Sequence, residues 1–390
     1  MKTKLFLMLG VSAMLFASCT DDNVKPIDKK EGELSGKITS NLTLDANIQY
    51  VLNDPLIVTD GATLTIPAGT TIKAEAGGTN TYVLVEKGGK IIANGTADKP
   101  IVFTSNSSTP KEGDWGGVII NGKARISGEA GKVAENGTEI NTTIRYGGDV
   151  NDDNSGILNY VRFEYTGARI NDEKEHNGLT LNAVGNKTQL SNLYFTYAAD
   201  DAIEFFGGSV NATNILVVNC SDDMVDFTEG YTGTISNVYG VREEGYLDAT
   251  SDPRGIEGDG NMDGKYTTHV NQSDCIIDGI TLINNAPGKT MVDAIKIRRG
   301  AKATVKNAYV KFGPKTVIVD YKNAVLVDLV DFIDEKGNAA AGTTVTYAFD
   351  PANKLDKATI KDAGLGGVTK NDALKGANTS VFGWTGYKFN

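Results

Sequence analysis

A repeat of about 22 residues constrains the fold of this chain more than any other feature. The segments 200–208 (DDAIEFFGG) and 222–230 (DDMVDFTEG) are closely similar and start 222 − 200 = 22 residues apart, and Asn192, Asn214 and Asn237 keep steps of 22 and 23 residues. A fixed period with short apolar strands is typical of stacked coils, each built from one supersecondary unit. Equivalent residues then form columns at the strand spacing of about 4.8 Å. The acidic residues of the repeat therefore become a ladder of carboxylates.

The chain reads as all-β, because strands are short, turn signals are frequent and no long segment has helical periodicity. Glycine accounts for 45 of 390 residues, which suits many tight turns. Three strand types recur, and they fall at 60–66, 88–93, 115–120 and 300–305; at 158–163, 190–195, 213–217, 235–239, 277–282 and 305–309; and at 178–181, 202–205, 224–227 and 294–297. Three strands per coil predict a parallel β-helix with a period of about 22 to 24 residues.

The same pattern divides the chain. We expect a signal peptide at 1–18, a flexible polar tether at 19–40, the β-helix at 41–336 and a C-terminal cap at 337–390, where the period is lost. A cap is expected because the last coil would otherwise expose an open sheet edge. Insertions are predicted near 128–156 and 244–274, where the repeat is interrupted, and such turn loops tolerate added residues.

Three motifs carry a family resemblance. They are 113–122 (GDWGGVIING), 177–181 (NGLTL) and 201–208 (DAIEFFGG). The run from about 42 to 308 resembles the right-handed parallel β-helix of the pectin-lyase-like superfamily. The motifs are similar to those of β-helix lipoproteins in Gram-negative bacteria that have no agreed biochemical role. The resemblance implies the handedness and the fold and leaves the activity open.

The N-terminus predicts export and a lipid anchor. Basic Met1–Lys4 precedes the apolar run 5–17, which is too short to span a bilayer. Ala17 and Ser18 before Cys19 resemble the lipobox of bacterial lipoproteins, which implies acylation of Cys19, while an ordinary cleaved signal is the alternative. Asp21 and Asp22 resemble the signal that sends some lipoproteins to the outside of the outer membrane. We expect a lipid-anchored protein of the outer membrane that faces the cell exterior.

The charge balance limits the partners. Loss of residues 1–18 removes Lys2 and Lys4 and changes the net charge from −11 to 36 − 49 = −13. So acidic a surface argues against nucleic acid and bare polyanions. Cys220 and Cys275 then remain, and both one disulfide and two buried thiols are compatible with the sequence.

Glu204 and Asp226 are the predicted catalytic candidates. Strand alternation turns their apolar neighbours toward the core and these two side chains outward on adjacent coils. Their expected spacing is close to the carboxyl separation of about 5 Å in retaining glycosidases, and one member of such a pair has a raised pKa. A solvated acidic face, or one neutralised by cations, is the alternative.

Two enzyme groups on this fold offer partial parallels. The polygalacturonase group uses paired aspartates, a Gly-His-Gly and an Arg-Ile-Lys, whereas this chain has the runs 175–178 (EHNG) and 296–298 (KIR) in another order. The resemblance therefore transfers no catalytic role to His176. Chemistry of the pectate lyase kind would use Ca²⁺ and an arginine base. Its candidates here are Asp201, Asp223 and Asp226 for the metal and Arg242, Arg298 or Arg299 for the base.

A separate calcium site is predicted at Asp259, Asn261 and Asp263. The run 259–264 (DGNMDG) has oxygen side chains at alternate positions and a glycine for the sharp turn, as in the first half of a calcium loop. Val270 stands where such a loop has its bidentate glutamate, so only a half-site is present. A plain turn is the alternative.

Tyr194, Tyr239 and Tyr309 are the predicted ligand-binding residues. They lie on one outward column of the second strand type, and exposed aromatic rings stack well on sugars. An insertion or the C-terminal cap covering this column is the alternative.

Together these features favour a surface-anchored binding or adhesive β-helix scaffold for glycans, with Ca²⁺ as a structural ion. A polysaccharide lyase or glycoside hydrolase using the acidic ladder is the second hypothesis, and an accessory subunit of an outer-membrane receptor is the third. The sequence leaves catalysis undecided and does not identify the ligand.

Overall fold

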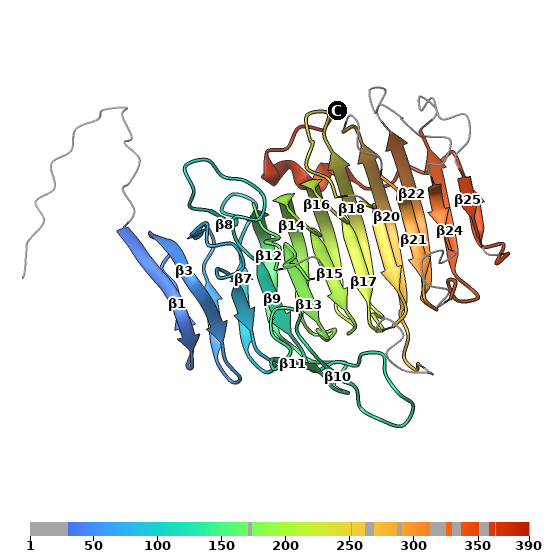
Figure 1. Ribbon diagram of the computed structural model, residues 1–390. Helices are drawn as coiled ribbons and strands as arrows, with labels where there is room; N and C mark the ends of the chain where they lie inside the picture. The colour runs from blue at the N-terminus through green and yellow to red at the C-terminus, as the bar shows by residue number, and fades with distance from the viewer. Residues whose placement is uncertain are drawn as a thin grey trace, which may run out of the picture.

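The chain folds into a right-handed parallel β-helix (Figure 1). The computed structural model describes residues 30–170, 174–250, 252–261, 269–286, 291–312, 325–329, 337–350, 359–362 and 364–389. Within them, 24 strands join in one continuous sheet, and only β10 and β11 form a separate pair. Figure 1 shows the strands side by side in a row from β1 to β25. Residues 1–18, Cys19 and Asp263 lie outside the described residues.

Two parallel ladders make up most of the coils. The ladder of short strands comprises β6 (Val83–Val85), β9 (Val118–Asn121), β13 (Leu179–Asn182), β15 (Ile203–Phe206), β17 (Val225–Thr228), β19 (Ile256–Asp259), β21 (Asp293–Arg298), β23 (Val325–Asp328) and β25 (Thr359–Lys361). The ladder of long strands comprises β12 (Gly156–Glu164), β14 (Gln189–Ala198), β16 (Asn211–Cys220), β18 (Thr234–Arg242), β20 (Asp274–Asn284), β22 (Lys302–Phe312), β24 (Thr344–Phe349) and β26 (Val368–Lys370).

The N-terminal coils extend further than predicted. They comprise β1 (Lys30–Ile38), β2 (Leu42–Thr43), β3 (Ile48–Val58), β4 (Thr63–Ile66), β5 (Thr71–Ala74), β7 (Lys90–Asn94) and β8 (Ile101–Ser105). Because β1 pairs in parallel with β3, residues 30–38 belong to the helix, and the predicted tether is wrong from Lys30 onward. The segment has the alternation of a strand, but its polar composition hid this in the sequence.

Strand alternation fills the interior with apolar side chains. Phe103, Phe163 and Phe195 occupy equivalent positions on successive coils and stack with centroids 5.7 and 5.0 Å apart. Such columns arise directly from the parallel register, which places each side chain above its equivalent in the previous coil. Cys220 and Cys275 are also buried here, as free thiols.

An asparagine ladder bends the long strands β14, β16 and β18. Asn192, Asn214 and Asn237 have left-handed φ values of 53°, 58° and 56°, which asparagine tolerates better than most residues. Each amide bonds to the one below it, from Asn214 Nδ2 to Asn192 Oδ1 at 3.0 Å and from Asn237 Nδ2 to Asn214 Oδ1 at 2.8 Å. The bend divides the long strand into two, so a coil has three straight segments, as predicted.

The two predicted insertions differ. Residues within 128–156 leave the helix and form the antiparallel hairpin of β10 (Glu135–Gly137) and β11 (Arg145–Gly147). The predicted insertion at 244–274 is wrong as one block, because it contains β19, which pairs with β17 and β21. A coil therefore runs through this stretch, between two longer loops.

The C-terminal cap begins later than predicted. Strands β24, β25 and β26 continue both ladders to Lys370, so the expected boundary at 336 is wrong. Residues 371–389 then turn back along the helix and form the 3₁₀ helix η2 (Thr379–Thr385), which contacts β16. In Figure 1 this red segment lies beside the middle coils. It covers a side of the helix rather than its end.

Candidate active site

One face of the short-strand ladder carries a row of charged side chains. Glu204, Asp226, Glu257 and Lys296 are register partners on β15, β17, β19 and β21. They point outward because alternate residues of the same strands, such as Ile203 and Phe205 beside Glu204, belong to the core. The predicted adjacency of Glu204 and Asp226 is therefore confirmed, and Glu257 extends the row by one coil.

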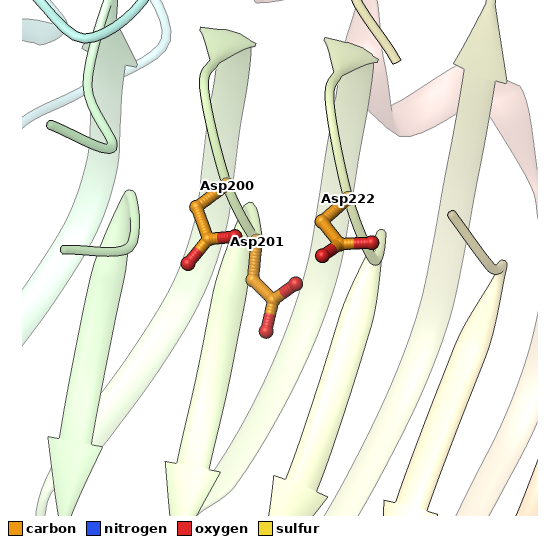
Figure 2. Close-up of side chains that lie close together, drawn as sticks. All are labelled: Asp200, Asp201 and Asp222. Atoms are coloured by element: carbon orange, nitrogen blue, oxygen red, sulfur yellow. The ribbon is translucent and has the colours of Figure 1, made fainter. Parts of the chain in front are cut away.

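A second row lies in the turns that precede these strands. Asp201 Oδ1 accepts the backbone N–H of Asp223 at 2.8 Å, and Asp223 Oδ1 accepts the backbone N–H of Arg254 at 2.6 Å. These aspartates thus tie each turn to the next coil. Figure 2 shows Asp201 between Asp200 and Asp222, whose side chains project from equivalent turns.

The carboxylates of both rows crowd together. Oxygens of Asp201, Glu204 and Asp226 lie within 4.8 Å of one another, and so do oxygens of Asp223, Asp226 and Glu257. Burial first, and then the neighbouring carboxylate of Asp226, raises the pKa of Glu204 well above its usual range. Burial, followed by Glu257 and Asp259, does the same to the pKa of Asp226. The group therefore holds protons to a higher pH than isolated carboxyl groups do, or it binds a cation.

Glu204 and Asp226 differ in their partners. Asn177, which is 2 % exposed, donates from Nδ2 to Glu204 Oε2. Asp226 Oδ1 is buried and has no hydrogen-bond partner among the described residues. A buried carboxylate oxygen without a donor is a position that a proton or a ligand hydroxyl satisfies.

A cavity of about 380 Å³ opens over this pair. The hairpin insertion lines one side of the cavity with residues 136–139, Thr142 and Tyr146. The lining also includes Lys174, Phe206 and Glu229. Asp259, Arg298 and Arg299 line the cavity further along the coils. Its size lies within the range of small-molecule sites, about 300–1,000 Å³.

The basic end of the cavity is held by ion pairs. Arg298 Nε lies 2.6 Å from Asp259 Oδ1, and Arg299 Nη1 lies 2.5 Å from Asp259 Oδ2. Arg298 also reaches Glu257 Oε1 at 2.7 Å, and Arg254 reaches Glu257 Oε2 at 3.1 Å. The guanidinium groups of Arg298 and Arg299 are therefore fixed at this end of the cavity.

The predicted calcium loop has other contacts in the part that the structure describes. Both carboxylate oxygens of Asp259 accept from Arg298 and Arg299, and Asn261 Nδ2 donates to Gln272 Oε1 at 3.0 Å. Asp263 is outside the described residues. Among the described residues, the carboxylates able to hold a divalent cation lie instead in three groups, one of Asp200, Asp201 and Asp222 and two that include Asp226.

The predicted aromatic strip is covered, which corrects its use as a ligand surface. Tyr194 and Tyr239 are only 7 % and 6 % exposed, because η2 and the residues around it pack over them. Phe389 contacts the Tyr239 ring edge to face at 4.9 Å. Tyr309 is half-buried and donates to Asp350 Oδ2 at 2.9 Å. Sequence periodicity identified the column, but not the segment of distant chain that folds over it.

The remaining candidates lie away from the cavity. His176 is buried, and burial lowers the pKa of its imidazole to about 4, so it is neutral at pH 7. Arg242 is buried too, with Nε donating to the carbonyl of Cys220 at 2.9 Å. Sequence reasoning missed Asn177 as a Glu204 partner and also missed Arg254 and Glu257. The run 256–259 (IEGD) echoes Ile203–Phe206, which was the available signal for Glu257.

Within the described residues, no helix has the length and apolar character needed to cross a membrane. A search of curated proteins gave no match. Among solved structures, the chain is similar to the crystal structure of an alginate lyase from Paenibacillus sp. str. FPU-7, with 14 % identity over 82 % of this chain and 99 % of that one. The TM-score is 0.22, which is too low for any transfer of function.

The family assignment rests on sequence. A family model for the pectate-lyase like beta helix domain matches residues 36–385, which is nearly the whole described chain and includes both charged rows. The match agrees with the two parallel ladders. Membership supports a carbohydrate-related role. This chain belongs to the pectate-lyase-like β-helix family.

Proposed function

We propose that this protein is a glycoside hydrolase that cleaves its substrate at the Glu204–Asp226 pair. The observation that carries the proposal is the placement of these two carboxylates, with oxygens within 4.8 Å, in a cavity of about 380 Å³. Arg298 and Arg299 line the same cavity. The covered aromatic strip removes the main support for a purely adhesive scaffold.

The reaction needs one protonated and one ionised carboxyl group. The protonated group gives its proton to the glycosidic oxygen as the bond to the anomeric carbon breaks and its electron pair stays on that oxygen. The carboxylate attacks the anomeric carbon, and water then hydrolyses the resulting ester while returning a proton to the first group. A separation of about 5 Å favours this direct attack over an intervening water.

The electrostatics of the pair favour one protonated and one ionised carboxyl group. Burial raises the pKa values of both Glu204 and Asp226; the charge of Asp226 raises that of Glu204 further, and the charges of Glu257 and Asp259 raise that of Asp226 further. Two carboxyl groups this close titrate as a unit, and they share a proton up to a higher pH than isolated carboxyl groups do. Asn177 stabilises a negative charge on Glu204, and Arg298 stabilises a negative charge on Asp226.

The test is product analysis with purified protein and a panel of polysaccharides: arabinoxylan, laminarin, galactomannan, polygalacturonate and alginate. Hydrolysis predicts saturated products carrying added water. Glu204→Gln and Asp226→Asn should each lower the rate about 10²- to 10⁴-fold, as for loss of a general acid or base. Asp98→Asn, at an exposed site, is the matched control. Unsaturated uronates, or products unaffected by both substitutions, would refute the proposal.

Carbohydrate binding without cleavage is a second candidate. The site holds more carboxylates than hydrolysis requires, and oxygen clusters of this kind suit Ca²⁺. Binding alone predicts that the wild-type protein retains a polysaccharide unchanged in length, and that a chelator abolishes retention. Chelator-resistant cleavage supports the hydrolase instead.

We also propose that Cys19 anchors the protein to the outer membrane, facing the cell exterior. The lipobox-like Ala17-Ser18-Cys19 supports this. Replacement Cys19→Ala should release the protein from the membrane fraction, because acyl chains supply the attachment. Unchanged membrane retention of the variant in fractionated cells would contradict it.

A further inference from the structure

A second cavity lies where β14 and β16 end, just before the turns that lead into the acidic strands. It measures about 300 Å³ and is lined by Tyr197, Asn219, Glu243, Tyr246, Leu247 and Asp248. Tyr197 precedes Asp200 by three residues, and Asn219 precedes Asp222 by three. Tyr197 and Asn219 therefore lie just before the turns that carry Asp200 and Asp222 in Figure 2.

The wall of this cavity contains a preorganised aromatic ring. Tyr197 is half-buried and stacks on Tyr165 with centroids 5.5 Å apart and planes 5° from parallel. Both tyrosines have left-handed φ values, 55° and 63°, which bulky residues rarely adopt. Strained backbone held in this way recurs at binding sites. A ring fixed before binding loses little entropy when it contacts a ligand.

The loop on the opposite side is fixed as well. Tyr246 donates to Glu112 Oε2 at 2.9 Å, and its hydroxyl also lies 2.8 Å from Ser221 Oγ. Thr250 Oγ1 donates to Asp222 Oδ1 at 2.9 Å. The loop from 243 to 250 is therefore tied to the acidic turn, and the cavity is a formed site.

The charges exclude one class of sugar. Glu243 and Asp248 line the cavity, and none of its described lining residues is Lys or Arg. A uronate would meet carboxylates here without a basic partner. An uncharged sugar offers hydroxyl donors to these acceptors and an apolar ring face to Tyr197.

We propose that the Tyr197 cavity is a subsite for an uncharged sugar unit. The substrate is then a neutral polysaccharide that spans this subsite and the Glu204–Asp226 site. The inference rests on the proposed hydrolase for the second site, but it predicts binding that is measurable without cleavage.

The experiment is affinity electrophoresis in gels containing arabinoxylan, laminarin or galactomannan, with polygalacturonate as the charged comparison. Glu204→Gln is the parent, so that no substrate is consumed. At least one neutral polysaccharide should retard it more than polygalacturonate does. Adding Tyr197→Ala should weaken that retention about 3- to 10-fold, the range for loss of an aromatic contact, and Tyr197→Phe should preserve it.

Tyr160→Ala is the control for nonspecific damage. Tyr160 also has a left-handed φ, 50°, but packs on Trp384 and lies outside this cavity. It should leave retention unchanged, and circular dichroism melts should show that each variant folds. Equal retention of the Tyr197→Ala variant and its parent, tighter binding of polygalacturonate, or no retention by any neutral polysaccharide would overturn the inference.

The two proposals fail separately. If the wild-type protein cleaves nothing but the Tyr197-dependent retention is observed, the hydrolase is refuted and the subsite stands. If cleavage depends on Glu204 while Tyr197→Ala changes neither retention nor cleavage, only the subsite is refuted.

Discussion

Single residues in this protein inherit their chemistry from the repeat. Glu204 is acidic, and so is its partner one coil further, Asp226, because the repeat places equivalent residues in one column. Burial then removes from water two carboxyl groups that would otherwise form a solvated surface pair. The result is a set of carboxyl groups that hold protons at unusually high pH.

Glu112 gives a pH prediction that is independent of the proposed catalysis. Burial raises the pKa of its carboxyl to about 7, although the hydrogen bonds from Ser221 and Tyr246 act in the opposite direction and lower it. The folded state therefore binds the proton more tightly than the unfolded state. The contribution of Glu112 to the free energy of unfolding is therefore complete below pH 4.5 and is lost as the pH rises through about 7.

Glutamine cannot ionise, so the Glu112→Gln variant should not lose this stability as the pH rises. We expect its free energy of unfolding, relative to that of wild type, to increase by roughly 2 kcal/mol from pH 4.5 to pH 8, allowing for solvent screening. Urea unfolding at a series of pH values measures this. The exposed Asp98→Asn control should show no such trend. A constant difference between Glu112→Gln and wild type at all pH values would contradict the assignment.

At the scale of an element, the asparagine ladder sets the bend of the long strands β14, β16 and β18. Asn214 combines a left-handed φ of 58° with amide bonds to the coils on both sides. Asn214→Ala loses the bonds and also strains the backbone, so it should cost about 2–4 kcal/mol. Asn214→Gly removes only the bonds and should cost about half as much. Urea midpoints rank the two variants, and equal midpoints would show that backbone conformation is not the reason for asparagine here.

The C-terminal segment is an element defined by what it covers. Asn237 Oδ1 accepts from the backbone N–H of Asn378 at 2.6 Å, and Phe382 is fully buried against the aromatic column. Deleting residues 372–389 should expose Tyr194, Leu216 and Tyr239. We expect increased binding of a hydrophobic dye and a lower melting temperature. A truncated protein identical to the full chain in both measurements would mean that the segment is not bound in solution.

At the scale of the whole molecule, the sequence predicts what repeats and misses what does not. The ladders, the columns and the Glu204–Asp226 adjacency follow from a 22-residue period, because parallel register leaves no other arrangement. Coverage of Tyr194 by a segment about 190 residues away, and closure of the cavity by the 128–156 insertion, depend on contacts without periodicity. Glu257 was missed because two loops surround its coil and obscure the repeat.

The proposed hydrolase requires that the Glu204–Asp226 pair is an active site and not merely a by-product of repetition. The most direct measurement is the release of reducing ends from neutral polysaccharides by wild-type protein and by Asp226→Asn, at equal concentration and matched folded fraction. We expect the wild type to release reducing ends and the variant to release them at a rate lower by about 10²-fold or more. Release at the same rate by both proteins, or by neither, would contradict it.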